Sequence, residues 1–374
     1  MAVRPKAGNQ SSQSKVTRGD LPTGEVLTHP RFPRQKPEFS SAPPGRYIDC
    51  ALPLPEKSLI ARIQERARSG QGVVAGIGDD AAILRIPFSH QALVTTDFSL
   101  EGIHFRRDWH PPEVIGHRAL TRGLSDIAAM GGRPIAAFLS LGLPPTLPQA
   151  WVDGFFKGLL DLGKRFKLSL AGGDTSASPA GVLIDIVVVG SVPSDQAIRR
   201  GGARAHDRIY VTGMLGGSAA ALQLLRSGRR LRPRDFPQHF HPMPRLQVGQ
   251  FLRQRAIASA MIDLSDGLST DLAHLCTESR VGAEIEADRI PLASLGKPAK
   301  PVDRRFALDG GEDYELLFTA PPGMRVPRRV AGIPITPIGR IRPAPHIFLI
   351  SRGKRVKLAP KGWQHFEKGP STLR

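Results

Sequence analysis

The sequence VIGHRALTRGLSDIAAMGG occupies residues 114–132 and combines a helical pattern with an acidic motif. Apolar residues recur at helical spacing from Val114 to Met130, which predicts an amphipathic helix. The pair Gly131-Gly132 follows and is typical of a helix C-terminus. The acidic motif Leu-Ser-Asp lies within this predicted helix at residues 124–126.

Five further acidic motifs, each beside glycine or a hydroxyl residue, lie on either side of this helix. They are GIGDDAA (76–82), VTTD (94–97), GGDTS (172–176), DLSDG (263–267) and GGEDYEL (310–316). The chain as a whole has 52 Lys and Arg against 33 Asp and Glu, a formal net charge of +19. In so basic a chain, this placement of carboxylates indicates metal ligands gathered from distant segments into one site.

The acidic motifs suit magnesium, which prefers oxygen ligands and usually binds through a few carboxylates plus substrate phosphates. Any single Asp has a simpler explanation as a helix cap or turn residue, but six such clusters are much harder to explain that way. Glycine lets the backbone approach an anion and offer N–H donors, so Gly172-Gly173 and Gly310-Gly311 suit phosphate binding. Bridging cations would let carboxylates hold a polyphosphate that they would otherwise repel. The candidate ligands on this reasoning are Asp79, Asp80, Asp97, Asp126, Asp174, Asp263 and Asp266.

Length and composition describe a globular protein of two domains. At 374 residues the chain is long for a single core. No stretch approaches the roughly 20 apolar residues of a membrane span, and the N-terminus lacks the apolar core of a secretory signal peptide. Two cysteines, Cys50 and Cys276, are too few for a disulfide framework or a zinc site. A cytoplasmic location is therefore expected.

Two alternative functions are disfavoured by the residues themselves. The positive charge raises nucleic-acid binding, but only 6% of residues are aromatic and the cations are dispersed rather than arranged as a basic stripe with stacking residues. Residues 158–164 (GLLDLGK) have the glycine and lysine spacing of a P-loop. However, Arg165 replaces the required Ser or Thr and the segment lies within a predicted helix, so a P-loop is rejected.

Mixed helices and strands recur along the chain, which predicts an α/β or α+β fold with mixed sheets packed with helices. We expect a disordered basic extension over residues 1–50, an N-terminal domain over 51–193 and a C-terminal domain over 194–374. Helices are expected from Glu56 and over residues 114–130, 149–166, 219–225 and 267–278. Strands are expected over residues 92–97, 182–189, 208–212, 314–319 and 346–350.

Taken in order, the six acidic motifs resemble those of thiamine-monophosphate kinases, a family of the aminoimidazole ribonucleotide synthetase-like superfamily. The resemblance runs from about Glu56 to the C-terminal GWQHF at 362–366. It implies a two-domain fold, dimerisation through N-terminal strands, and ATP-dependent phosphorylation of thiamine monophosphate to thiamine diphosphate by direct in-line transfer. No nucleophile framed by a base is evident in the sequence, which agrees with direct transfer.

The resemblance also implies a role for individual residues. Mg²⁺ would be held by Asp80, Thr95, Thr96, Asp97, Asp126, Asp174, Asp263 and Asp266. ATP would be contacted by Gly173, Asp174, Arg200 and Ser265. Thiamine monophosphate would be bound by His104, Glu312 and Trp363. From the residues alone, His104 could equally be a surface histidine, Glu312 a turn carboxylate and Trp363 a core residue.

The chain departs from the family pattern at two places. Arg122-Gly123 stands where the family often has Asn before Leu-Ser-Asp, and Phe155-Phe156 stands where a tyrosine near the adenine is expected. We predict a phosphotransferase with a phosphate group as acceptor, acting as a homodimer with ATP, Mg²⁺ and thiamine monophosphate. Neither a membrane nor nucleic acid is expected as a partner. The alternatives are a related enzyme of the superfamily with another acceptor, or a basic nucleic-acid-binding protein.

Overall fold

The computed structural model describes residues 54–67, 70–78, 80–296 and 298–363. All described helices and strands belong to one unit, Asp49–Arg374. The extension expected over residues 1–50 lies outside the described residues.

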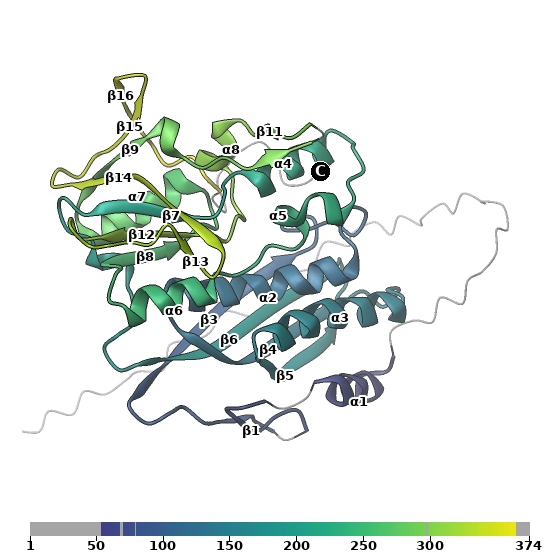
Figure 1. Ribbon diagram of the computed structural model, residues 1–374. Helices are drawn as coiled ribbons and strands as arrows, with labels where there is room; N and C mark the ends of the chain where they lie inside the picture. Colours follow the sequence, from purple (N-terminus) through teal and green to yellow (C-terminus); the bar gives the residue numbers. More distant parts are fainter. Residues whose placement is uncertain (1–53, 68–69, 79, 297, 364–374) are drawn as a thin grey trace, which may run out of the picture. The chain divides into compact units, whose positions relative to one another are not determined.

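A four-stranded sheet forms the base of the N-terminal half (Figure 1). Its strands, in spatial order, are β3 (His90–Leu100), β6 (Leu183–Pro193), β4 (Arg133–Leu143) and β5 (Ser169–Ala177). β6 pairs antiparallel with both of its neighbours, whereas β4 and β5 are parallel. The helices α2 (Pro112–Ala129) and α3 (Gln149–Arg165) lie side by side on one face of this sheet.

Alternation along β3 decides which of its side chains can reach the helices. Because successive residues of a strand point to opposite faces, Thr95 and Asp97 face α2 whereas Val94, Thr96 and Phe98 face away. The two apolar residues of the outer set, Val94 and Phe98, are 67% and 57% exposed. The sheet therefore has one face covered by helices and one face with exposed apolar residues.

Two glycines allow α2 and α3 to approach closely. A Cβ added to Gly116 would lie 2.0 Å from the carbonyl oxygen of Phe155, and one added to Gly158 would lie 1.8 Å from that of Glu113. Only glycine permits backbones to pack at this distance. Gly158 belongs to the segment with P-loop spacing, which is confirmed as part of a helix.

A short helix and a hairpin complete the N-terminal half. The helix α1 (Glu56–Arg66) is attached to α3 by Arg62, which donates to Asp153 at 2.7 and 2.6 Å. The strands β1 (Val73–Ala75) and β2 (Ile83–Leu84) pair with each other, and their apolar side chains pack on Ala136 and Ala171.

The C-terminal half is built on a larger mixed sheet. Its spatial order is β16 (Lys354–Lys357), β15 (Ile347–Ser351), β9 (Gly282–Glu286), β14 (Ile333–Arg342), β7 (Arg208–Thr212), β12 (Leu316–Ala320) and β8 (Ala260–Asp263), and β13 (Arg329–Val330) pairs with β14. A separate pair is formed by β10 (Ser294–Leu295) and β11 (Lys300–Pro301). The helices are α4 (Gly217–Arg226), α5 (Pro237–Phe240), α6 (Leu246–Gln254), α7 (Leu268–Ser279) and α8 (Arg304–Asp309).

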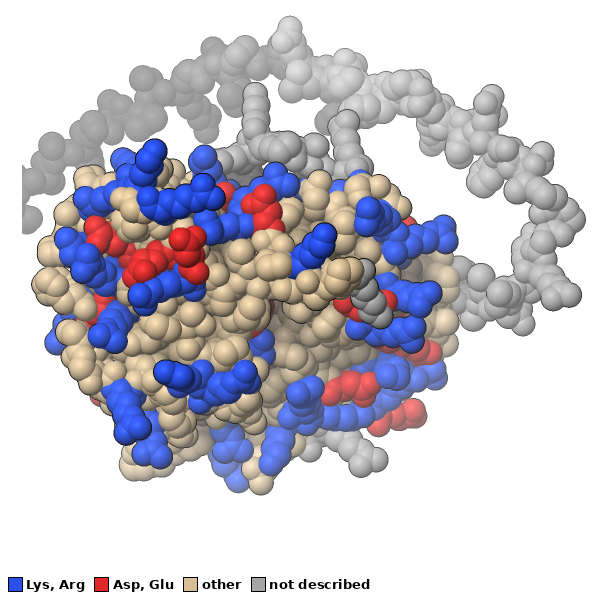
Figure 2. Space-filling model, turned by 45° about the horizontal axis from the view of Figure 1, so that its top comes forward, with Lys and Arg blue, Asp and Glu red and all other residues tan. Residues whose placement is uncertain are grey.

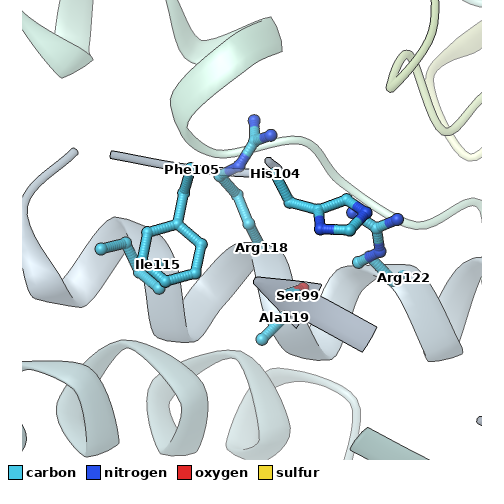
Figure 3. A pocket seen from close by; sticks show the side chains of 7 residues that line it. All are labelled: Ser99, His104, Phe105, Ile115, Arg118, Ala119 and Arg122. Atoms are coloured by element: carbon cyan, nitrogen blue, oxygen red, sulfur yellow. The ribbon is translucent and has the colours of Figure 1, made fainter. Parts of the chain in front are cut away.

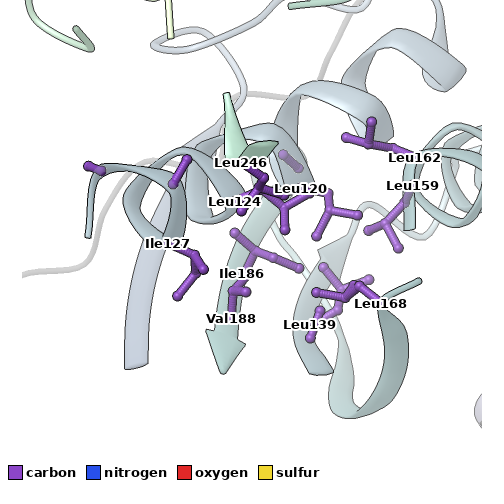
Figure 4. Close-up of a cluster of buried hydrophobic side chains, with 14 of the residues drawn as sticks. Leu120, Leu124, Ile127, Leu139, Leu159, Leu162, Leu168, Ile186, Val188 and Leu246 are labelled. Carbon is purple, nitrogen blue, oxygen red and sulfur yellow. The ribbon is translucent and has the colours of Figure 1, made fainter. Parts of the chain in front are cut away.

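The main apolar core joins the two halves through α2 (Figure 4). Leu120, Leu124 and Ile127 of α2 pack between Ile186 and Val188 of the N-terminal sheet and Leu246 of α6. A second core lies in the C-terminal half, around Leu268, Leu272 and Leu275 of α7. Two mixed α/β halves of this kind confirm the expected fold class.

The expected boundary between two domains at residues 193/194 stays a prediction. β6 ends at Pro193, but one apolar core contains residues from both sides of that point. Among the described residues, no helix is both long and apolar enough to cross a membrane. On the face drawn in Figure 2, Lys and Arg are spread among other residues rather than gathered in one stripe.

Candidate active site

Carboxylates from β3, α2 and the C-terminal half converge around Asp126. Thr95 Oγ1 donates to Asp126 Oδ2, which links β3 to α2. Ser125 Oγ donates to Asp263 Oδ2 at 2.7 Å, which links α2 to the end of β8. Asp97 lies within electrostatic range of Asp126 and Asp266. We call Asp97, Asp126, Asp263 and Asp266 the carboxylate cluster.

The carboxylate cluster is electrostatically strained as it stands. Burial and the charge of Asp126 raise the pKa of both Asp97 and Asp263 to about 7. Burial likewise raises the pKa of Asp126, against the hydrogen bond from Thr95. Oδ2 of Asp97 is buried and has no hydrogen-bond partner in the part of the chain that the structure describes. A bound cation would relieve this repulsion and occupy that oxygen.

Glu312 lies beside the carboxylate cluster and is held by two arginines of α2. Arg118 donates to Oε2 at 2.6 Å, and Arg122 donates to Oε1 at 3.4 Å. Burial alone would raise the pKa of Glu312, but the two guanidinium groups outweigh it and lower the pKa to about 2. The backbone of Glu312 has a φ of +66°, and its N–H donates to Ser265 O at 2.8 Å. Glu312 is therefore an ionised carboxylate held in a strained loop.

Three further residues expected to bind the substrates, His104, Trp363 and Arg200, lie close to Glu312 or to the carboxylate cluster. His104 lines a small cavity together with Arg118 and Arg122 (Figure 3), and its Nδ1 accepts from Leu100 N at 3.0 Å. Trp363 is 40% exposed, and its backbone N–H donates to Asp266 O at 3.1 Å. Arg200 lies near Asp126 and Asp263, where its charge opposes the rise of their pKa values.

A second group of expected site residues lines a larger cavity against β5. This cavity has a volume of about 570 Å³ and is lined by Asp80, Gly173, Asp174, Phe138 and Phe156, among others. A Cβ at Gly173 would lie 2.0 Å from the carbonyl oxygen of Leu139, so the close approach of β5 to β4 requires glycine here. A lining that combines carboxylates with aromatic side chains is typical of a small-molecule site.

Strand order separates the two groups within one chain. Asp174 pairs with Ser140 of β4, Ser140 with Asp185 of β6, and Asp185 with Phe98 of β3. Three strand spacings, about 14 Å, therefore lie between β5 and β3. Asp80, Gly173 and Asp174 are not brought to the carboxylate cluster. Among the described residues, no group of three or more His, Cys, Asp or Glu could hold a metal ion unaided.

Two expected ligands need separate mention. Thr96 lies on the outer face of the sheet, where its hydroxyl donates to Asp185 Oδ1 at 2.7 Å, away from its neighbour Thr95. Asp79 lies outside the described residues.

No role was expected for Arg118 or Arg122 from the sequence. A signal was available, because residues 118, 122 and 126 are four apart and so lie on one face of a helix. The two departures from the family pattern also have structural places. A Cβ at Gly123 would lie 2.6 Å from Val188 Cγ2, so α2 packs tightly on β6 there. Phe156 is 3% exposed and lines the larger cavity.

Comparisons with known proteins agree on one family. Residues 78–192 match the model of the AIR synthase related protein N-terminal domain, and residues 204–327 match the C-terminal domain. The chain is 40% identical over 326 residues to the thiamine-monophosphate kinase of Escherichia coli (strain K12), covering 83% of this chain and 98% of that protein.

Solved structures give the same result. The crystal structure of thiamine-monophosphate kinase from Stenotrophomonas maltophilia K279a is similar, with a TM-score of 0.69 and 34% identity over 80% of this chain and 97% of that one. A structure of AaThiL complexed with AMPPCP and TMP has a TM-score of 0.67 and 33% identity, covering 83% of this chain and 96% of that one.

Proposed function

The chain belongs to the thiamine-monophosphate kinase family, and on this premise we propose that it phosphorylates thiamine monophosphate with ATP to give thiamine diphosphate. The bond between the γ-phosphorus of ATP and the β–γ bridging oxygen breaks, and a phosphate oxygen of thiamine monophosphate forms the new bond, leaving ADP. The observation that carries the proposal is the position of Glu312, ionised and held by Arg118, directly beside the carboxylate cluster. An acceptor site thus adjoins a cation site.

Magnesium is the cation that the carboxylate cluster suits. A divalent cation is favoured over an apolar or anionic ligand by three features of the cluster. Its ligands are hard oxygens, the pKa values of its carboxyls are raised, and a buried oxygen of Asp97 has no hydrogen-bond partner among the described residues. The cluster would hold the ion together with Thr95, and substrate phosphates would complete the octahedron that the protein alone does not. Bound magnesium would neutralise charge on the phosphates during transfer.

Asp80, Thr96 and Asp174 remain proposed ligands of a different kind. They lie away from the carboxylate cluster within one chain, so they would act only on metal held elsewhere along the bound nucleotide or in another copy.

ATP would use both parts of the site. The larger cavity offers the aromatic rings of Phe138 and Phe156 to a base, and Gly173 and Asp174 line the same cavity. Phenylalanine in place of tyrosine would keep stacking and lose a hydroxyl contact. Arg200, beside the carboxylate cluster, would donate a charge-assisted fork to phosphate, and Ser265 lies next to Asp266.

The acceptor would be held by His104, Glu312 and Trp363. Glu312 carries a negative charge that suits the cationic ring of thiamine, and the half-exposed indole of Trp363 can stack on such a ring. Protein groups in this arrangement bind and orient, and none of them is an activated nucleophile. This favours direct in-line transfer, since positioning and charge stabilisation suffice for phosphoryl transfer.

The protein would work as a homodimer. The exposed Val94 and Phe98 on the outer face of β3 support an interface through the N-terminal strands. The cytoplasmic location expected from the sequence remains a prediction.

One assay tests the proposed function. The full chain is incubated with ATP, Mg²⁺ and thiamine monophosphate, and thiamine diphosphate is measured by chromatography. We expect one thiamine diphosphate per ADP, and no product after chelation of the metal. Turnover of ATP with another phosphorylated acceptor, without thiamine diphosphate, would identify a different enzyme of the superfamily.

A further inference from the structure

We propose that Arg122 binds the phosphate group of the acceptor and positions it between the carboxylate cluster and Glu312. The inference deepens the proposed function and rests on it. Arg122 belongs to no motif by which the chain was related to its family. It would therefore be a substrate-positioning residue in addition to those expected from the motifs.

Arg122 lies between the two halves of the proposed reaction. Its Nε is 3.9 Å from Asp97 Oδ1, and its NH1 is 3.4 Å from Glu312 Oε1. Asp97 belongs to the cation side and Glu312 to the acceptor side. The group to be phosphorylated must lie between those two sides, because the transferred phosphoryl passes from one to the other.

The guanidinium of Arg122 has donors to spare. A guanidinium carries five N–H donors. The hydrogen bond to Glu312 is long, at 3.4 Å, and the buried Nε has no hydrogen-bond partner within the described ranges. Leaving a buried donor unsatisfied is costly, so a donor of this kind in a site points to a ligand that satisfies it.

Arg118, one turn earlier on α2, shows what a structural arginine looks like in the same place. Its NH1 donates to the carbonyl oxygen of His239 in α5, and its NH2 donates to Glu312 at 2.6 Å. Its side chain is 7% exposed, against 19% for Arg122. Arg118 therefore holds Glu312 in place, while Arg122 is open to a bound molecule.

The guanidinium of Arg122 suits an anion, provided that a cation shields the carboxylates around it. Arg122 is attracted by Glu312, Asp97 and Asp266, and those carboxylates would repel a phosphate unless a cation stood between them. A planar fork of donors matches phosphate oxygens in geometry as well as charge. His104 lines the same small cavity as Arg122, so a phosphate bound by Arg122 would also lie near His104 (Figure 3).

The experiment compares ligands that differ only in the phosphate. Binding of thiamine monophosphate and of thiamine is measured by calorimetry on the full-length wild type, Arg122→Gln and Arg122→Lys, with the same magnesium concentration throughout. Arg340→Gln is the matched control, since it also removes one guanidinium but lies on β14 beside Glu284. We expect Arg122→Gln to weaken the binding of thiamine monophosphate by about 10- to 100-fold, while the affinity for thiamine changes less than about 2-fold. Arg122→Lys should recover part of the loss.

Steady-state kinetics and inorganic phosphate give independent readouts. The KM for thiamine monophosphate should rise in Arg122→Gln while the KM for ATP does not, and stabilisation of the protein by inorganic phosphate against heat should disappear. An equal loss of binding affinity for thiamine and for thiamine monophosphate in Arg122→Gln would show that Arg122 only supports Glu312. That result would overturn the inference. A rise confined to the KM for ATP would overturn it too.

The two proposals fail in different ways. If the wild type makes no thiamine diphosphate, the proposed function is wrong, whereas an active wild type with an unchanged Arg122→Gln variant contradicts only the role of Arg122. Should the wild type be inactive, the inorganic phosphate measurement still decides whether Arg122 binds an anion: equal stabilisation of both proteins would exclude it.

Discussion

Asp97 is a residue at which function opposes stability. Its carboxylate is partly buried near Asp126 and Asp266, with Oδ2 fully buried, and its pKa is raised to about 7 by burial and by these charges. Such a group costs folding free energy when ionised, because the unfolded chain would ionise it at lower pH. The cost is tolerated because the same oxygens can bind a cation.

Replacing Asp97 by Asn should therefore separate activity from stability. We expect Asp97→Asn to lower kcat/KM by roughly 100-fold or more, since a charge that holds magnesium against the phosphates is lost. The unfolding midpoint of the metal-free variant at pH 8 should be unchanged or higher than that of the wild type. Asp161→Asn, on the exposed side of α3, is the control and should alter neither quantity. Near-normal activity in Asp97→Asn would show that this carboxylate is not a ligand.

His110 makes stability depend on pH in the acid range. It is buried against His239, with 3.0 Å between their Nε2 atoms, and burial followed by the charge of Arg118 lowers the pKa of His110 to about 4. The folded-state pKa lies below the ordinary value of 6.5. The stabilisation is thus complete above pH 6.5 and is lost as the pH falls toward 4.

We expect His110→Gln to lose less stability on acidification than the wild type. The shift corresponds to about 3 kcal/mol at most, so urea unfolding at pH 7, 5.5 and 4.5 should resolve it. His346→Gln, at an exposed position before β15, serves as the control and should follow the wild type. Parallel curves for wild type and His110→Gln would contradict the assignment.

The helix α2 is the element on which the site depends. It carries Arg118, Arg122 and Asp126 on one face, and its apolar face joins the sheet below to the C-terminal half. Both properties follow from one helical repeat, since polar and apolar residues occupy different sides of the same turn.

At the contact between α2 and α3, close packing and helix propensity have opposite effects on the stability of a Gly158→Ala variant. Gly158→Ala would gain about 1 kcal/mol from propensity, but its Cβ would lie 1.8 Å from the Glu113 carbonyl oxygen, which the helix backbone holds in place. Overpacking costs about 1–3 kcal/mol, so we expect net destabilisation. Denaturant unfolding measures this, with Lys157→Ala on the exposed side of α3 as control. A more stable Gly158→Ala variant would mean that the helices can separate freely.

The two helices on the N-terminal sheet could be predicted from local pattern, whereas the strand β4 and the helix α6 were not expected from the sequence. The roles given to the site residues by their motifs stay predictions. Helical spacing gave 114–130 and 149–166, close to α2 and α3, because each helix has one buried face. Alternation in β3 would even have separated Thr95 from Thr96. The gap between Asp174 and Asp97 could not be predicted, because it depends on β6 and β4 lying between β5 and β3, which no local pattern encodes.

Positive and negative charge have different places in the molecule. Lys and Arg are scattered over the face seen in Figure 2, whereas the carboxylate cluster lies between the two halves and takes residues from both. A phosphate-handling enzyme benefits from a positive surface, because anionic substrates are attracted over distances of about a Debye length.

Dimerisation through the outer face of β3 gives the last prediction, in which Val94 and Phe98 are both replaced by Glu. The two residues are 67% and 57% exposed and lie on the same face of one strand, so charges there would have to be buried in an interface formed by two copies. We expect light scattering coupled to size exclusion to find a dimer for the wild type and a monomer for the double variant, with circular dichroism unchanged. Val356→Glu on β16 also adds a charge at an exposed valine and should remain dimeric.

A dimeric double variant would place the interface elsewhere, and a wild type that is monomeric at every concentration would exclude the homodimer. Because neither residue faces α2, loss of the dimer with full activity would further show that each chain holds a complete site, whereas loss of both would show that the site needs the assembled pair.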